Sequence, residues 1–282
     1  MRSKPPSVLT PTILKIYDIA PYKDGVKTDV NSAVFPLSTN LVGGSWDYPS
    51  DNRQVREAII RRHQSYTKQL LWFLKTDPAV PSNHRKKMAT YTWCGDEFID
   101  NGHSPTQLYV REVRRMIGTQ VLTSHHSTNA TLARGAGVAS IGVADYAFDC
   151  HPVEILPQRL EPVAATQAGE EGGDSRVEYK ATVEGCLVGG DPRVKGGWQI
   201  PYAAITPQRA QLRNLLVSVA LSTSYVAFAS IRLELTWMVL GQSAGTTAAI
   251  AVAQNTGAVQ DVELSFLHEQ LQAAGQVLFP VV

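Results

Sequence analysis

The chain has 282 residues, of which 44% are hydrophobic and 18% charged, and its formal net charge is +1. This length allows one large domain or two ordinary ones, and the composition is typical of a globular rather than a disordered protein. The small net charge predicts no general affinity for nucleic acid or for an anionic membrane surface.

The cysteines and the first residues bear on the compartment. Cys94, Cys150 and Cys186 are widely spaced and form no CxxC pair, which favours a reducing, cytoplasmic setting without a disulfide framework or a zinc site. Residues 1–15 contain no continuous apolar run, so we expect no signal peptide.

Two helices are predicted in the first third of the chain, after a polar loop over residues 27–40. The clearer helix spans residues 52–75, where Asp51 or Asn52 can cap its start and prolines follow its end. A shorter helix is expected over residues 82–91. The buried stripe of the first helix would comprise Val55, Ile59, Tyr66, Leu70 and Phe73.

Residues 96–118 combine a loop with a short periodic segment. Their apolar spacing fits a helix, but the segment is also short enough for a strand. His103 lies in the loop beside a glycine, and Arg111 belongs to a dense charge cluster that is either a solvated face or a substrate-binding group. Further on, His125 and His126 would point to opposite faces of a strand, which makes them poor co-ligands for one metal.

Residues 134–140 contain a truncated glycine pattern, Gly135-x-Gly137-x-x-Ser140. A dinucleotide fingerprint follows a buried strand and opens a helix, whereas this one follows a polar, loop-like segment. We therefore interpret it as a decoy. The loop with Asp149 and His151 is open to two interpretations, an oriented acid–base group or a structural pair.

The remaining elements before the C-terminus are extended and then helical. Residues 177–183 alternate as a strand does, and residues 198–205 begin a second extended segment in which Pro201 indicates a sheet edge. Residues 261–274 read as a polar C-terminal helix.

The longest weakly charged stretch, residues 214–253, predicts a buried strand, a turn and a buried helix. A membrane hairpin is the alternative, but the serines, threonines and glutamine within the stretch argue against it. A helix that starts near residues 230–235 would offer free amide groups and a positive dipole end to an anion or an electron-rich ring. Gly241 and Gly245 share one helix face, and they permit either close packing on a sheet or close approach of a cofactor.

These segments together resemble the C-terminal portion of the FAD-dependent oxidoreductase family, within the glutathione-reductase-like flavoprotein superfamily. The resemblance covers nearly the whole chain, and the spacing from NLLV through SIR to LGQSAGTTAA is specific. The segments that carry it are KTDVNS (27–32), DYP (47–49), DEFIDNGH (96–103), QLYVREVRRMIG (107–118), DCH (149–151), PYAAITPQR (201–209) and residues 214–249.

The resemblance implies a role for particular residues. The start of the helix after SIR would meet the flavin and stabilise negative charge on the reduced ring. His103, Arg111 and His151 would face the substrate. Where relatives carry a histidine or similar residue, a glycine and a proline, this chain has Tyr225, Ala229 and Leu235. The implied FAD-binding residues are Ser230, Ile231, Arg232, Thr236, Gly241 and Gln242.

The sequence therefore predicts an α/β fold. Residues 1–207 would form an α+β substrate-side region, and residues 208–282 the closing strand and helix of a FAD-binding, Rossmann-like domain. The expected function is hydride transfer between a small-molecule substrate and FAD. The family's GxGxxG strand–helix start is missing from the sequence, so a separate N-terminal FAD-binding half is a possible partner. The alternative is a catalytically inactive remnant, or a carbohydrate- or ligand-binding module without flavin.

Overall fold

The computed structural model describes residues 30, 38–108, 110, 114–159, 179–185 and 195–280. The chain divides into two compact units. The first unit comprises residues 1–111 and 151–186, and the second comprises residues 112–150 and 187–282. Position 207, the expected border between substrate-side and FAD-binding functions, falls inside the second unit, and that functional border stays a prediction.

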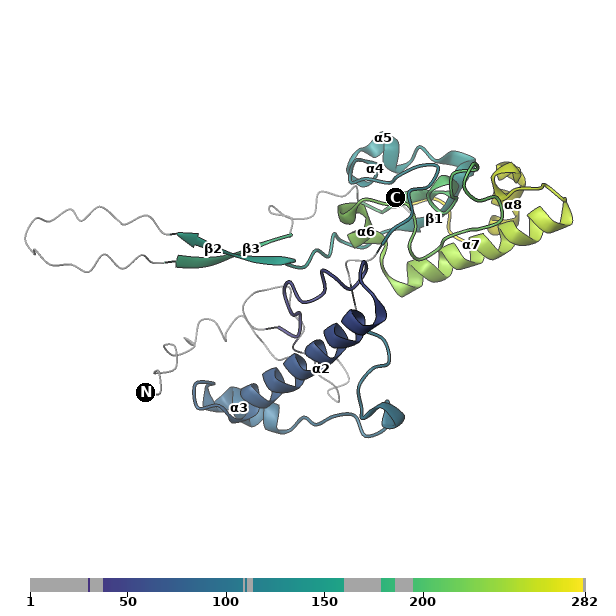
Figure 1. Cartoon of the computed structure of the whole chain (residues 1–282). Helices are drawn as coiled ribbons and strands as arrows, with labels where there is room; N and C mark the ends of the chain where they lie inside the picture. Colours follow the sequence, from purple (N-terminus) through teal and green to yellow (C-terminus); the bar gives the residue numbers. More distant parts are fainter. Residues whose placement is uncertain are drawn as a thin grey trace, which may run out of the picture. The chain divides into compact units, whose positions relative to one another are not determined.

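The first unit is built on a helical pair (Figure 1). Helices α2 (Arg53–Thr76) and α3 (Ser82–Ala89) confirm both helices predicted from the sequence. The Asn52 side chain caps α2 by accepting a hydrogen bond from the Val55 backbone N–H at 3.1 Å. The buried residues of this pair form a small core of Val30, Leu70, Leu74, Val80 and Met88.

A hairpin and a short helical turn complete the described part of the first unit. Strands β2 (Glu154–Arg159) and β3 (Tyr179–Glu184) pair antiparallel, which confirms the strand predicted over residues 177–183. The turn η1 (Ile99–Asn101) precedes His103, and the backbone of His103 has a positive φ of 58°. Residues 27–29 and 31–37 of the predicted loop lie outside the described residues.

The second unit packs helices against a two-stranded antiparallel sheet. Strand β1 (Ser140–Ala144) pairs with β4 (Trp198–Pro201), and Pro201 ends β4 at the edge of this sheet, as the sequence predicted. Helix α7 (Glu234–Ala253) packs on β1, where a Cβ on Gly142 would come within 2.9 Å of Val239 Cγ1. Glycine at this position therefore permits the close contact between helix and strand.

Short elements surround this sheet and complete a core in which Trp198, Ile200, Leu240 and Leu271 are almost fully buried. The C-terminal helix predicted over residues 261–274 is confirmed as α8. The remaining elements are α4 (His125–Thr128), α5 (Ala130–Ala133), η2 (Gly137–Ala139), η3 (Tyr202–Ala204), α6 (Tyr225–Ile231), η4 (Val259–Asp261) and α8 (Leu264–Ala273).

The strand predicted at the start of residues 214–253 is wrong. The segment before α6 is irregular, and its backbone is satisfied by single bonds to separate neighbours, from Val217 N to Ile205 O at 2.9 Å and from Ser222 N to Ala204 O at 2.8 Å. Ser224 then caps α6 by accepting from Ala227 N at 3.3 Å. Most of this segment is not buried, with Leu215 and Val219 42% and 47% exposed, and the Ser224 cap begins a helix rather than a strand at its end.

Two other sequence expectations need correction. His125 and His126 lie in the four-residue helix α4, not on a strand. Residues 114–117, for which a strand or a helix was expected, form neither, and Gly118 makes only an isolated bridge to Pro207. Among the described helices, none has both the length and the apolar character needed to cross a membrane. The described elements are a mixture of helices and small sheets, in agreement with the α/β class.

Candidate functional site

The junction between α6 and α7 sits within the segment that the sequence singled out. Helix α6 ends at Ile231, and Leu233 stands at the N-cap position of α7 without a side-chain hydrogen bond. The N-cap residue therefore leaves the first-turn amides of Glu234, Leu235 and Thr236 without a side-chain cap. Leu235 is 75% exposed, so solvent reaches this end of the helix.

The two residues that end α6 are fully buried within the second unit. The Ser230 hydroxyl donates to the Tyr146 carbonyl oxygen at 2.6 Å and accepts from Trp198 Nε1 at 3.3 Å. Ile231 has no exposed surface and belongs to the main core of this unit. In this structure both side chains hold the junction in place rather than face an opening.

Arg232 forms a buried ion pair with Asp149. Its guanidinium Nη2 lies 3.0 Å from Asp149 Oδ2 and also donates to the Asp149 carbonyl oxygen. The Arg232 side chain is 5% exposed and the Asp149 side chain 35% exposed. A buried cation needs such a partner, because transfer out of water is otherwise very unfavourable. The pair therefore ties the loop after β1 to the start of α7.

Helix α7 is apolar around its whole circumference, although one face is uncovered. Its only charged residue is Glu234. Ser243 anchors the inner face, where its hydroxyl donates to the Ile141 carbonyl oxygen at 2.8 Å. On the outer face, a Cβ added to Gly241 or Gly245 would meet nothing within 4 Å. The large apolar residues of this outer face are Leu235, Met238 and Val252, which are 75%, 70% and 82% exposed.

Such a helix is typical of the interior of a larger assembly, since a helix at a protein surface normally has one polar side. The outer face, defined by Leu235, Met238, Gly241, Gln242, Gly245, Ala249 and Val252, is exposed at every one of these positions. Thr236, by contrast, is half-buried. Of the six residues expected to bind FAD, Gly241 and Gln242 are accessible on this face.

Of the three residues expected to be catalytic, the structure describes two. His103 lies in the first unit with its Nδ1 3.0 Å from the Glu97 carbonyl oxygen. His151 is also in the first unit and is 5% exposed. Arg111 lies outside the described residues. The carboxylate of Asp149, which was considered as an orienting partner for a histidine, forms an ion pair with Arg232.

The glycine pattern at residues 135–140 is confirmed as a decoy. Gly137 opens the 3₁₀ turn η2, and Ser140 begins strand β1. The pattern thus leads from a turn into a strand, whereas a pyrophosphate-binding fingerprint leads from a strand into a helix.

A cavity of about 450 Å³ in the second unit was not predicted. His126 lies on its wall, and its Nδ1 accepts from the Thr123 backbone N–H at 3.1 Å. The Nε2 atom of the same ring lies 3.1 Å from the side-chain amide nitrogen of Gln120. The three-residue spacing of Thr123 and His126 is a local signal that could have indicated this turn from the sequence.

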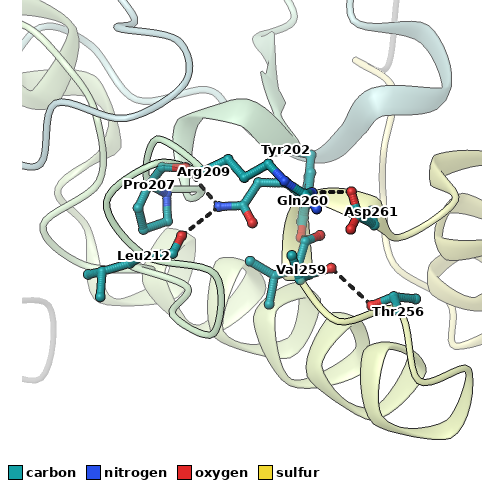
Figure 2. Close-up of polar contacts among 9 residues, drawn as sticks. Tyr202, Pro207, Arg209, Leu212, Thr256, Val259, Gln260 and Asp261 are labelled. Carbon is teal, nitrogen blue, oxygen red and sulfur yellow. Dashed lines mark hydrogen bonds and ion pairs between the residues drawn. The ribbon is translucent and has the colours of Figure 1, made fainter.

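Tyr202 and Gln260 also line this cavity, and Figure 2 shows the polar contacts around them. Gln260 donates through Nε2 to the carbonyl oxygens of Pro207 and Leu212, both at 2.9 Å. The Tyr202 hydroxyl donates to the Val259 carbonyl oxygen at 2.8 Å. Burial raises the pKa of Tyr202 far above its ordinary value, and a hydrogen bond from Thr247 offsets part of this effect. The phenol therefore stays protonated as a structural donor.

One comparison with known proteins decides the family. The model of the family described as FAD dependent oxidoreductase matches residues 9–273. The chain belongs to the FAD-dependent oxidoreductase family. FAD is the cofactor of this family, and a general oxidoreductase function follows from membership. No curated protein and no solved structure matches the chain.

The start and outer face of α7 are the part of the described structure that fits a flavin. Unsatisfied amides at a helix start attract an electron-rich group, and the side-chain-free surface at Gly241 and Gly245 lets a flat ring approach the backbone. The GxGxxG pattern that holds a pyrophosphate in dinucleotide-binding proteins does not occur in the sequence.

Proposed function

We propose that the chain contributes the flavin-ring side of a FAD-dependent oxidoreductase that transfers a hydride between a small-molecule substrate and the cofactor. The observation that carries this proposal is the uncapped, exposed start of α7 in a chain that belongs to a FAD-dependent family. Bound FAD would supply the redox chemistry by accepting or donating the hydride. The amides of Leu235 and Thr236 would stabilise negative charge on the ring.

The proposed partner is a separate FAD-binding half that carries a GxGxxG strand–turn–helix. It would hold the pyrophosphate and adenosine, and would cover the outer face of α7 as part of a Rossmann-like domain. Support comes from the apolar character of that face, whose exposed leucine, methionine and valine lose contact with water when a partner packs on them. Without that half, we expect the chain to bind FAD weakly or not at all.

The remaining expected residues take roles in the same proposal. His103 and His151 would be the proton-transfer groups, and Arg111 would bind an anionic part of the substrate. Gly241 and Gln242 would lie along the ring. Ser230, Ile231 and Arg232 would act by fixing the start of the helix, as their buried contacts support.

The test is a flavin titration of the purified chain, with and without a co-expressed candidate half that carries GxGxxG. We expect quenching of flavin fluorescence and a stable yellow complex only in the presence of the half. Gly245→Leu, which fills the outer face of α7, should abolish this complex. Ala273→Leu, at an exposed position on α8, is the matched control and should leave it intact. Tight FAD binding by the chain alone, or an intact complex with Gly245→Leu, would contradict the proposal.

The alternative function, a ligand-binding module without flavin, is favoured by one observation. Glu234 places a carboxylate in the first turn of α7, where it competes with an electron-rich ring for the same amides. Glu234→Gln distinguishes the two functions. It should strengthen flavin binding by the complex if α7 meets the ring, and should change nothing if it does not.

A further inference from the structure

A groove in the first unit has no role in the proposed flavin chemistry. It has a volume of about 840 Å³ and runs between the second half of α2 and the segment of residues 91–94 that follows α3. The buried side chains of Val30 and Met88 contribute to its floor. This size suits a ligand of several rings. We call it the aromatic groove, defined by Thr67, Lys68, Trp72, Lys75, Tyr91 and Trp93.

Two tryptophans flank the aromatic groove although neither is needed in the core. Trp72 is 68% exposed and Trp93 is 49% exposed. The helix positions Leu70 and Leu74 carry the buried stripe of α2, so Trp72 points away from it. Two large apolar rings exposed around one hollow are characteristic of a binding site. Their flat faces suit a ligand that itself presents a flat apolar face.

The charge of the aromatic groove is positive. Lys68 and Lys75 both line it, and none of the described lining residues is an aspartate or glutamate. Lys75 also donates to the Tyr91 carbonyl oxygen, which holds its ammonium group over the groove between α2 and residues 91–94. Lys68 is exposed. An anionic ligand would gain charge-assisted hydrogen bonds here, whereas a cation would be repelled.

Hydroxyl and amide groups also line the aromatic groove. Thr67, Thr92 and Gln69 line the same groove. The Thr92 hydroxyl donates to the Trp93 carbonyl oxygen and Gln69 Nε2 donates to Ser65 Oγ, and the side-chain oxygens of Thr92 and Gln69 can accept hydrogen bonds. An aromatic acid without hydroxyl groups would offer no donors to these acceptor oxygens. A pyranose ring instead combines an apolar C–H face, which stacks on indole, with several hydroxyl groups at its edge. A carboxylate on that ring matches the lysines.

From these three features together we infer that the aromatic groove binds an acidic sugar, a uronic acid or a short oligomer of one. The indoles of Trp72 and Trp93 stack on sugar faces, Lys68 and Lys75 bind carboxylate, and the threonines bind hydroxyl groups. This site is independent of flavin binding, because all of its lining residues belong to the first unit and its occupancy requires no redox step.

The test is isothermal titration of the full chain with trigalacturonate, and with neutral maltotriose as the comparison ligand. We expect the acidic sugar to bind more tightly than the neutral one. Trp72→Ala and Trp93→Ala should each weaken trigalacturonate binding about tenfold, because each removes the apolar surface on which a sugar face is buried. Lys68→Gln should weaken it about threefold and should reduce its salt dependence, while Lys75 remains in the groove.

Two control variants test the location. Lys86→Gln changes an exposed lysine on α3 outside the groove, and Ile99→Ala truncates an exposed apolar side chain in η1. Both should bind trigalacturonate as the unaltered chain does. Cys94 gives a second measurement, since its half-buried thiol lines the groove and bound sugar should slow its alkylation by iodoacetamide.

Three results would overturn the inference, and none involves FAD. The first is the absence of both heat and Cys94 protection up to about 10 mM trigalacturonate. The second is equal affinity for trigalacturonate and maltotriose, which would remove the role of the lysines. The third is unchanged binding by folded Trp72→Ala and Trp93→Ala variants.

Discussion

The buried pair of Arg232 and Asp149 allows a quantitative test of what holds the start of α7. Arg232 is 5% exposed, so Asp149→Asn removes the opposite charge that lies 3.0 Å from a buried guanidinium. Loss of one member of a buried pair costs about 3–5 kcal/mol. Because solvent reaches part of the Asp149 carboxylate, we expect the free energy of unfolding to fall by about 3 kcal/mol, or roughly 10 °C in Tm.

The reverse substitution should be milder. Arg232→Met removes the charge from the interior, and the Asp149 carboxylate that remains is 35% exposed and can be hydrated. We expect a loss of about 1–2 kcal/mol. The double variant should be about as stable as Arg232→Met alone, so the coupling energy should equal the loss for Asp149→Asn, about 3 kcal/mol.

The assay is urea unfolding followed by tryptophan fluorescence and circular dichroism, for the four proteins of this double-mutant cycle. A matched control is the exposed pair of Arg209 and Asp261, whose side chains are 49% and 40% exposed (Figure 2). The same cycle there should show no resolvable coupling, because water and salt screen it. Additive effects at Arg232 and Asp149 would refute the reasoning. They would reopen a direct role for Arg232 in cofactor binding.

The remaining predictions concern stability. Gly118→Ala should destabilise the chain by about 2 kcal/mol, since its Cβ would lie 2.5 Å from the Thr206 carbonyl oxygen. Gly241→Ala, with open space around it, should instead raise the free energy of unfolding by roughly 0.5–1 kcal/mol of helix propensity, measured by urea unfolding. Asn52→Ala should cost about 1 kcal/mol and lower the helical circular dichroism signal, and an unchanged signal would exclude the cap as a contributor. Stability should fall above pH about 10, because the folded state keeps the Tyr202 proton that the unfolded chain releases. Urea midpoints measured from about pH 8 to 11 should therefore fall less for Tyr202→Phe.

Sequence patterns within one segment predicted several of the helices and strands. The apolar stripe and the cap at Asn52 were sufficient for α2, and the alternation of residues 177–183 was sufficient for β3. The same signals failed at residues 214–224, where an apolar run looked like a strand. There the backbone bonds go to Ala204, Ile205 and Leu122, which lie outside the segment and belong to other parts of the chain, so no local pattern reported them.

The residues expected to contact the flavin also divide into features that one segment determines and features that depend on distant segments. The sequence singled out residues 230–245 correctly as a helix start with a small-residue face, because glycine spacing and the lack of charge are readable along one helix. It did not show that Ser230 and Arg232 point inward, since their partners Tyr146 and Asp149 lie more than eighty positions earlier in the chain.

By itself, the sequence determined the family and the main helices, and it predicted the segment where a flavin would meet the protein. These properties follow from residue types at short and regular spacing, because helix propensity and sequence motifs depend on residues that are close together in the chain. Only the tertiary structure decided which side chains are buried at that segment, that one face of α7 is uncovered, and that α2 and residues 91–94 form an aromatic groove. Each of these depends on segments distant in the chain coming together, and packing rather than local preference determines that.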